Sequence, residues 1–153
     1  MPRIQREANV SWDGNLARGS GSITAATGAF DDLPFSLASR VERPDGKTSP
    51  EELLAAAHAA CYGMSLAGEL TIAGSPPEHL DVTATVTLDE VEDGSHRIVG
   101  SDLVARARVR RIDEVELTRV AEIADRGCPF STLIKAGGRV TVRATLQGGP
   151  DGD

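Results

Sequence analysis

Hydrophobic and polar positions alternate with period two in several stretches of the chain. NVSW, GSITAA and PFSLASRV occupy the first forty residues and are separated by Gly, Asn and Asp, which predicts three short strands. DVTATVTLDEV and the less regular RIVGSDLVARARVR predict a long antiparallel pair. RVTVRATL, near the C-terminal end, predicts a last strand.

A helical pattern begins after the loop RPDGKTSP. Ser49 stands at the N-cap position, Pro50 at the first helical position and Glu52 at the third, which is the pattern of a capping box. The alanine-rich run that follows predicts a helix over residues 50–73.

Two shorter helices are expected further along the chain. IDEVELTRVAEIADRG has apolar residues at helical spacing and ends at Gly127, and Pro129 opens the segment PFSTLIKAG. The order is β-β-β-α-β-β-α-α-β, with strands too closely grouped for a doubly wound parallel sheet, so we predict an α+β fold. Residues 1–147 are expected to form one domain, and residues 148–153 a disordered tail.

Composition narrows the class of protein. The chain has 153 residues, 40% of them hydrophobic and 25% charged, which is typical of one soluble domain. Its net charge of -7 and its scattered basic residues argue against a nucleic-acid partner. The longest apolar run, residues 53–68, is shorter than the roughly 20 residues that span a bilayer, and no apolar signal segment opens the chain. We therefore expect a cytoplasmic protein that does not enter a membrane.

Cys61 lies in the run AAAHAACYGMSLAG, three residues after His58. The spacing places both side chains on one face of the predicted helix. An isolated cysteine in such a run is more often a small buried hydrophobic residue than a reactive thiol, and an isolated histidine is usually a hydrogen-bonded core residue. At this point both the structural and the chemical interpretation of Cys61 remain open.

Cys128 is the second cysteine, and it stands between Gly127 and Pro129. As the N-cap of the last helix, its sulfur would face unpaired N–H groups, an environment that lowers the pKa of a thiol. Gly-Cys-Pro is equally typical of a simple turn, so the local sequence favours neither interpretation.

Other candidate residues carry weaker signals. Glu51 is left free by the capping role of Glu52, while Arg40, at the end of the third predicted strand, and Arg18 are charged residues with ordinary exposed roles. Three potential zinc ligands exist, but no Cys-x-x-Cys pair accompanies them, so we expect no metal site. The sequence has no Gly-x-Ser-x-Gly elbow of a serine hydrolase and no phosphate-binding glycine loop.

Two segments together resemble a known family. SPEELLAAAHAACYGMSL and, 67 residues after its cysteine, CPFSTLIKAG are similar to the paired cysteine segments of the OsmC/Ohr family of thiol peroxidases, and His58 is typical of its OsmC branch. The order of predicted elements fits the family over nearly the whole chain. The resemblance implies antiparallel sheets around two central helices, in an intertwined homodimer with active sites at the interface.

The resemblance also implies an activity. The expected protein is a cysteine-based peroxidase that reduces organic hydroperoxides in oxidative or osmotic stress defence, with Cys61 as peroxidatic cysteine and Cys128 as resolving cysteine. Glu51 matches the glutamate that pairs with an arginine beside the reactive thiol, for which we expect Arg40, with Arg18 as the alternative. No bound cofactor is implied. The disulfide would be reduced by an external dithiol protein, for which a lipoyl group is the family's example.

Helix geometry limits how Glu51 can serve Cys61. Ten residues of helix are about 15 Å, so we expect Glu51 to approach from the partner subunit or the long arginine to bridge much of the gap. Apolar walls for a bulky hydroperoxide are expected from Met64, Phe130, Ile134, and Phe35 or Leu37. The competing hypothesis is a non-catalytic stress protein of the same fold that binds a small apolar ligand, which has no need of a thiol pair.

Overall fold

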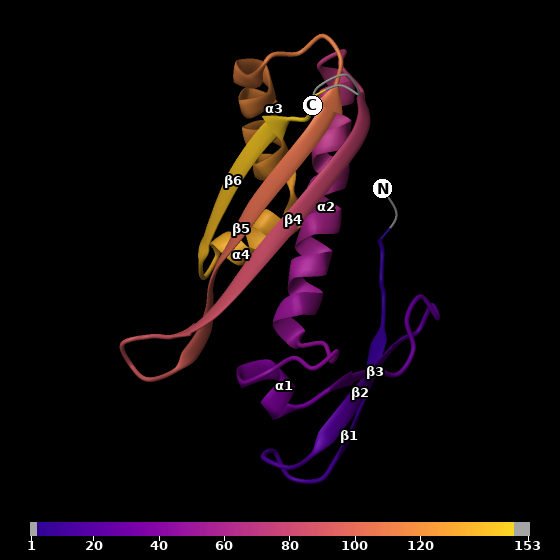
Figure 1. Cartoon of the computed structure of the whole chain (residues 1–153), viewed down its shortest axis with the longest axis vertical. Coiled ribbons are helices and arrows are strands. Elements are labelled where there is room, and N and C mark those ends of the chain that lie inside the picture. The colour runs from indigo at the N-terminus through magenta and orange to yellow at the C-terminus, as the bar shows by residue number, and fades with distance from the viewer. Residues whose placement is uncertain (1–2, 149–153) are drawn as a thin grey trace. The chain divides into compact units, whose positions relative to one another are not determined.

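The computed structural model describes residues 3–148 and divides into two compact units, Met1–Leu53 and Leu54–Asp153, which are described separately. The first unit contains an antiparallel meander, in the order β1-β2-β3, and a short helix (Figure 1). Its elements are β1 (Ala8–Asp13), β2 (Ser20–Ala25), β3 (Leu33–Phe35) and α1 (Leu37–Val41).

Gly21 holds the aromatic residues of this meander together. It pairs with Trp12 on one side and Phe35 on the other. A Cβ atom at this position would come within 2.5 Å of the Phe35 ring, so only glycine leaves room for it. The rings of Trp12 and Phe35 then meet with centroids 5.5 Å apart.

The third strand ends earlier than the sequence pattern predicts. The alternation in PFSLASRV extends to Val41, but β3 stops at Phe35 and the next residues form α1. The cause is a capping box: the Ser36 hydroxyl accepts from the backbone N–H of Ser39 at 3.1 Å, and the Ser39 hydroxyl accepts from that of Ser36 at 2.9 Å. Arg40 therefore lies on a helix and not at the end of a strand.

Helix α2 (Pro50–Ile72) begins in the first unit and continues through the second, close to the predicted range. Ser49 caps it as predicted, accepting from the backbone N–H of Glu52 at 3.2 Å. The second hydrogen bond of the predicted capping box would join the Glu52 carboxylate to the backbone N–H of Ser49. Instead, the carboxylate accepts from the Thr48 hydroxyl at 2.7 Å.

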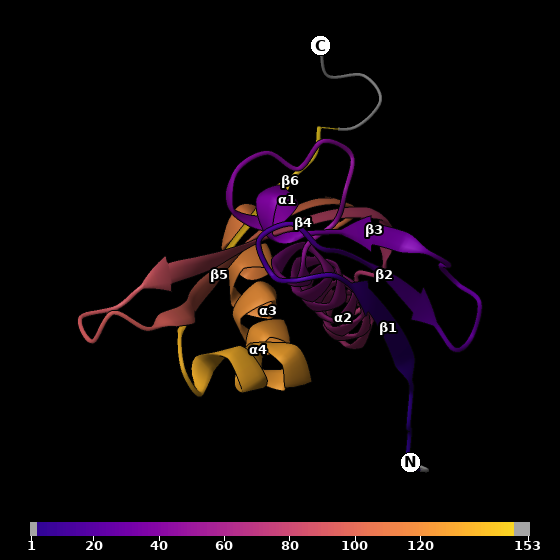
Figure 2. The same ribbon diagram turned by 90° about the horizontal axis from the view of Figure 1, so that it is seen from below.

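The second unit is a three-stranded sheet with helices on one face (Figures 1 and 2). Besides most of α2 it contains β4 (Pro77–Glu90), β5 (His96–Val109), α3 (Glu114–Gly127), α4 (Pro129–Lys135) and β6 (Arg139–Leu146). Strands β4 and β5 are antiparallel, as expected, whereas β6 runs parallel to β5, so this sheet is mixed. The α+β class is confirmed, with α1 as an additional element.

The three strands alternate between a covered and an open face. The inward residues include Leu80, Val82, Ala84, Leu103, Ala105, Ala107, Val140, Val142 and Ala144. Thr87 pairs with Gly100 but Leu88 with Ile98, so the register shifts by one residue at Val99. This irregularity explains why the alternation in the sequence is ragged around Gly100.

The core of the second unit lies between this sheet and helices α2 and α3. Tyr62, Leu66 and Leu70 follow one another at four-residue spacing on α2, and all three are fully buried. The Tyr62 hydroxyl donates to the carbonyl oxygen of Ala121 on α3, at 3.2 Å. The face of α2 that begins with His58 is therefore a packing face.

Leu66→Ala is expected to lower the free energy of unfolding by about 2–5 kcal/mol, because it leaves a cavity where a fully buried side chain stood. Denaturant unfolding at fixed protein concentration measures the change. Val115→Ala on α3, where the side chain is 80% exposed, is the control and should change the free energy of unfolding by about 0.5 kcal/mol or less. Equal losses in the two variants would contradict this description of the core.

Helices in the described range are too short or too polar to cross a bilayer. Gly148 is exposed, and the rest of the predicted tail, residues 149–153, lies outside the described residues.

Candidate functional site

Two thiols from distant parts of the sequence meet in the second unit. Cys61 is on α2, and Cys128 is the residue between α3 and α4, where it ends one helix and caps the next. Both are free, and Cys128 lies close enough to Cys61 to raise the pKa of its thiol. Cys128 is fully buried, whereas Cys61 is only partly buried. A reagent in solution therefore reaches Cys61 first.

The surroundings of Cys61 within this unit do not favour its thiolate. Burial raises the pKa of the Cys61 thiol, and the nearby Cys128 raises it further, while the backbone of Phe130 lowers it in part. Phe130 is in the first turn of α4, so this lowering comes from the start of that helix. Cys128 is the N-cap residue of α4 but makes no side-chain capping hydrogen bond.

His58 sits at the centre of a buried polar cluster. Its Nδ1 lies 2.8 Å from the hydroxyl oxygen of Ser101 on β5, and its Nε2 lies 2.8 Å from the hydroxyl oxygen of Ser131 on α4. All three side chains are fully buried. One imidazole therefore links three elements of the unit, and both of its ring nitrogens are engaged.

Burial lowers the pKa of His58, and the nearby charge of Lys135 adds to this, while Asp125 opposes it. The ring is neutral near pH 7, with one N–H donor and one acceptor nitrogen shared between the two serines. With both nitrogens occupied, His58 is poorly placed as a base for the thiols or as a metal ligand. Within residues 3–148 no group of three or more possible ligands is gathered around one point.

Arg40 and Glu51 form an ion pair in the first unit. The guanidinium Nε lies 3.0 and 3.1 Å from the two carboxylate oxygens, and a terminal nitrogen lies 2.5 Å from Oε1. Burial alone would raise the pKa of Glu51, but the hydrogen bonds from Arg40 and from the backbone outweigh it and lower the pKa. The same pairing raises the pKa of Arg40. This two-oxygen geometry fixes the plane of the guanidinium.

Arg18, the alternative arginine, lies in the turn after β1. Its backbone N–H donates to the Asn15 side chain at 3.0 Å. Glu51 is thus paired with Arg40 in the structure, and Arg18 belongs to a different part of the first unit.

The residues expected to form apolar walls belong to both units. Met64 is 71% exposed on α2, and Phe35 packs against Trp12 in the first unit. Phe130 packs against the core next to the thiols. Ile134 lines an apolar pocket of about 210 Å³ together with Leu54, Ile98, Leu133 and Gly137.

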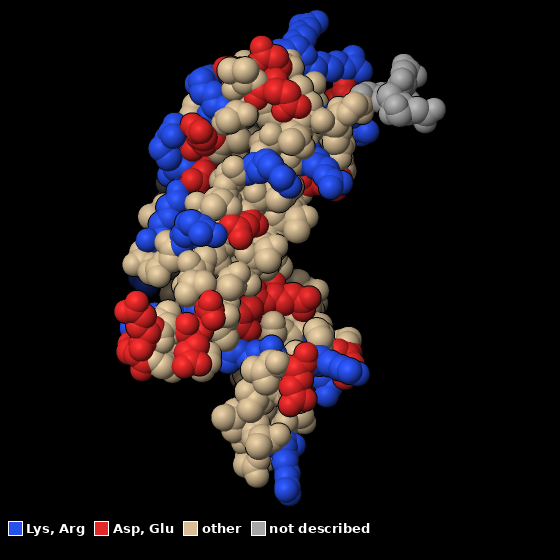
Figure 3. Space-filling view, turned by 60° about the vertical axis from the view of Figure 1, so that its left-hand side comes forward, with Lys and Arg blue, Asp and Glu red and all other residues tan. Residues whose placement is uncertain are grey.

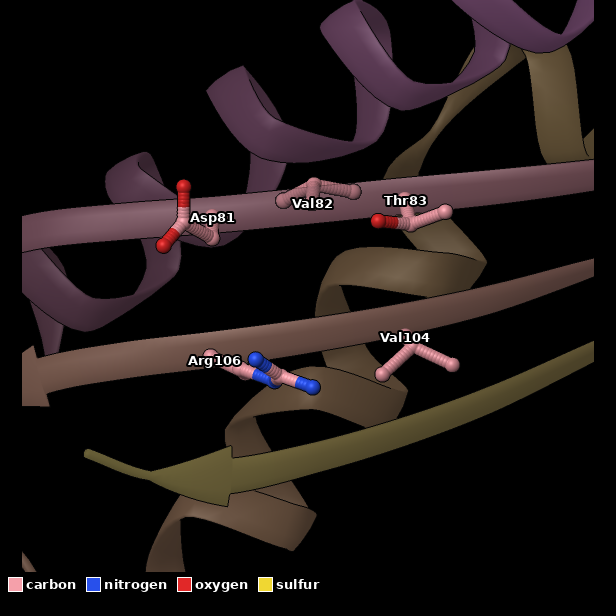
Figure 4. Close-up of a pocket in the computed structure, with 5 residues that line it drawn as sticks. All are labelled: Asp81, Val82, Thr83, Val104 and Arg106. Carbon is pink, nitrogen blue, oxygen red and sulfur yellow. The ribbon is translucent and has the colours of Figure 1, made fainter.

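A second pocket lies at strands β4 and β5 of the sheet. It measures about 230 Å³ and is lined by Asp81, Val82 and Thr83 on β4 and by Val104 and Arg106 on β5 (Figure 4). It contains neither cysteine.

Basic and acidic side chains are interspersed over this unit, and acidic ones gather at the tip of the β4–β5 hairpin (Figure 3). This mixture is typical of a solvated sheet face.

Sequence reasoning missed Ser101 and Ser131. Ser131 follows Cys128 by three residues, just as His58 precedes Cys61 by three, so the two polar residues stand one turn from the two thiols. Ser101 is an inward residue of a half-buried strand, where a hydroxyl needs a partner. A polar residue at an inward position was the available signal for it.

Comparison with known proteins agrees with this architecture. The family model described as OsmC-like protein matches residues 43–143. Peroxiredoxin OsmC of Escherichia coli (strain K12) and that of Shigella flexneri are each 36% identical over 133 residues, covering 87% of this chain and 92% of the relative. The crystal structure of the organic hydroperoxide resistance protein OhrB of Bacillus subtilis is similar with a TM-score of 0.69 and 27% identity, over 92% of this chain and 98% of that one.

A further structure shows the same fold at lower sequence similarity. An organic hydroperoxide resistance protein from Elizabethkingia anophelis matches with a TM-score of 0.73 and 21% identity, over 97% of this chain and all of the other. The match of the family model and the identity to two relatives confirm the family expected from the sequence. The chain belongs to the OsmC family.

Proposed function

We propose that the protein is a thiol peroxidase that reduces organic hydroperoxides to alcohols. The observation that carries the proposal is the contact between a partly exposed thiol, Cys61, and a buried one, Cys128, both free and from segments distant in the sequence. Relatives named as peroxiredoxin and as organic hydroperoxide resistance protein support it.

In the first step the Cys61 thiolate attacks the terminal oxygen of the hydroperoxide. The O–O bond breaks, the sulfur keeps that oxygen as a sulfenic acid, and the other oxygen leaves with a proton as the alcohol. Because the surroundings of Cys61 in its own unit raise its pKa, the thiolate needs a cation from elsewhere. We assign this role to Arg40, whose guanidinium is oriented by Glu51.

The position of Glu51 on α2 bears on how Arg40 reaches the thiol. Since ten helical residues are about 15 Å, we propose that the Arg40–Glu51 pair serves the Cys61 of a second subunit in a homodimer. The alternative is that the long arginine side chain bridges much of the distance within one chain.

In the second step Cys128 condenses with the sulfenic acid. A bond forms between the two sulfurs, the S–O bond breaks, and the oxygen leaves as water with the proton of the Cys128 thiol. The resulting disulfide needs two electrons, which we propose come from an external dithiol protein, of which a lipoyl protein is one candidate. The apolar pocket beside Ile134 offers a surface for the organic part of a hydroperoxide.

Thiol titration before and after one equivalent of cumene hydroperoxide tests the proposal. We expect two thiols per chain to be lost without a crosslink between chains, because both electrons come from one pair of cysteines. A Cys128→Ser variant should instead lose its single remaining thiol as a sulfenic acid that dimedone traps. Two unchanged thiols in the unsubstituted chain would refute the peroxidase and favour the non-catalytic binding protein.

A further inference from the structure

The buried cluster around His58 has no role in the two chemical steps above. His58 precedes Cys61 by one helical turn, and Ser131 follows Cys128 by three residues. The 2.8 Å contact between the His58 ring and the Ser131 hydroxyl therefore ties the helix that carries one thiol to the helix that begins beside the other. The second contact, to Ser101, ties the same ring to the sheet.

Because these hydrogen bonds are buried, losing one of them costs free energy. The histidine and both serines are fully buried, so none of them can exchange its partner for bulk water. Among the side-chain hydrogen bonds that α4 makes to other described residues, only the one between Ser131 and His58 reaches α2, whereas Thr132 and Lys135 bond Cys128 and Asp125. A hydrogen bond has a preferred distance and direction, whereas apolar packing tolerates sliding.

We propose that His58 is a positioning residue for the resolving step: through Ser131 it holds α4, and with it Cys128, within bonding distance of the Cys61 sulfur. The inference rests on the proposed function for its biological meaning. Its chemical consequence is a competition at the sulfenic acid of Cys61. Attack by Cys128 gives the disulfide and water, whereas a second hydroperoxide molecule transfers an oxygen atom to the sulfur, giving a sulfinic acid and a second alcohol.

The two hydrogen bonds of the His58 ring are expected to have different effects when each is removed. Ser131→Ala removes the tie to α4 and is expected to slow formation of the Cys61–Cys128 disulfide about tenfold, with sulfinic acid accumulating on Cys61 in excess hydroperoxide. Ser101→Ala removes only the tie to the sheet and is expected to change that rate less than about threefold. Neither should slow the reaction of Cys61 with the first hydroperoxide molecule, which is followed by dimedone trapping in a Cys128→Ser background.

Two further variants separate positioning from general stability. His58→Leu removes both hydrogen bonds and is expected to behave like Ser131→Ala. His58→Gln keeps one donor and one acceptor, so it should restore most of the rate at which the Cys61–Cys128 disulfide forms. Ser75→Ala is the matched control, because Ser75 is also buried and its hydroxyl bonds a backbone carbonyl away from the thiols. It should leave the disulfide rate unchanged.

A measurement that needs no hydroperoxide keeps this inference distinct from the proposed function. Equilibration with oxidised and reduced dithiothreitol gives the stability of the Cys61–Cys128 disulfide directly. We expect Ser131→Ala and His58→Leu to weaken it about tenfold relative to Ser75→Ala. Unchanged disulfide equilibria and rates in both variants would overturn the role of His58. A weakened disulfide in a chain whose thiols cumene hydroperoxide leaves intact would uphold it and refute the peroxidase.

Discussion

Cys61→Ser is expected to lower kcat/KM for cumene hydroperoxide at least about a thousandfold, because a serine hydroxyl is not ionised at neutral pH and cannot accept the peroxide oxygen as sulfur does. The expected loss is the largest of any single substitution, since Cys128 is fully buried and a hydroperoxide cannot reach it in place of Cys61. A coupled assay with a dithiol reductant measures the rate.

The substitution is structurally mild, which keeps the result interpretable. Cys61 is only partly buried and serine has nearly the same volume, so the thermal midpoint should remain close to that of the unsubstituted chain. Retention of more than a tenth of the activity in a folded Cys61→Ser variant would show that Cys128 is the attacking thiol. The proposed order of the two steps would then be wrong.

Arg40→Gln is expected to lower kcat/KM at pH 7 about a hundredfold, the second-largest effect. The surroundings of Cys61 in its own unit raise the pKa of the thiol, so without a cation little thiolate exists at pH 7. The reactive form of a thiol is the deprotonated one. The variant should therefore regain activity as the pH rises towards the raised pKa, while the unsubstituted protein should already be active at pH 7.

Two companion variants test whether the charge or its orientation matters. Glu51→Gln keeps the Arg40 charge but weakens the two-oxygen contact that orients it, and an intermediate loss is expected. Arg43→Gln, in the exposed segment just after α1, removes a positive charge at a nearby position in the sequence and should leave the pH profile unchanged. Equal pH profiles for Arg40→Gln and the unsubstituted protein would exclude Arg40 as the source of thiolate stabilisation.

Local signals in the sequence account for most of the fold. The capping residue Ser49 and the end of α3 at Gly127 lie where the sequence predicts them, because caps and helix breakers act over a few residues. The segment after Phe35 was predicted incorrectly as strand, since FSLASRV alternates in polarity while its two serines form a capping box. The direction of β6 has no local signature, because alternation looks the same in parallel and antiparallel strands.

The candidate site was predictable where it depends on residue types and not where it depends on packing. The pairing of Arg40 with Glu51, which the family resemblance implied, is present across a loop within one unit, whereas the charges alone indicated only ordinary exposed roles. The serines that hold His58 come from β5 and α4, and only the folded chain brings them to the same ring. The lowering effect of Phe130 on the pKa of the Cys61 thiol likewise depends on how α4 packs.

The unequal exposure of the two sulfurs also imposes a direction on the return half of the proposed cycle. An incoming thiolate must line up with the S–S bond and strike one sulfur while the other departs. With Cys128 enclosed and Cys61 at the surface of its unit, only Cys61 can become linked to the reductant, and Cys128 is the leaving group. The transient complex with the electron donor is thus a mixed disulfide at Cys61. The same sulfur atom therefore reacts with both the oxidant and the reductant.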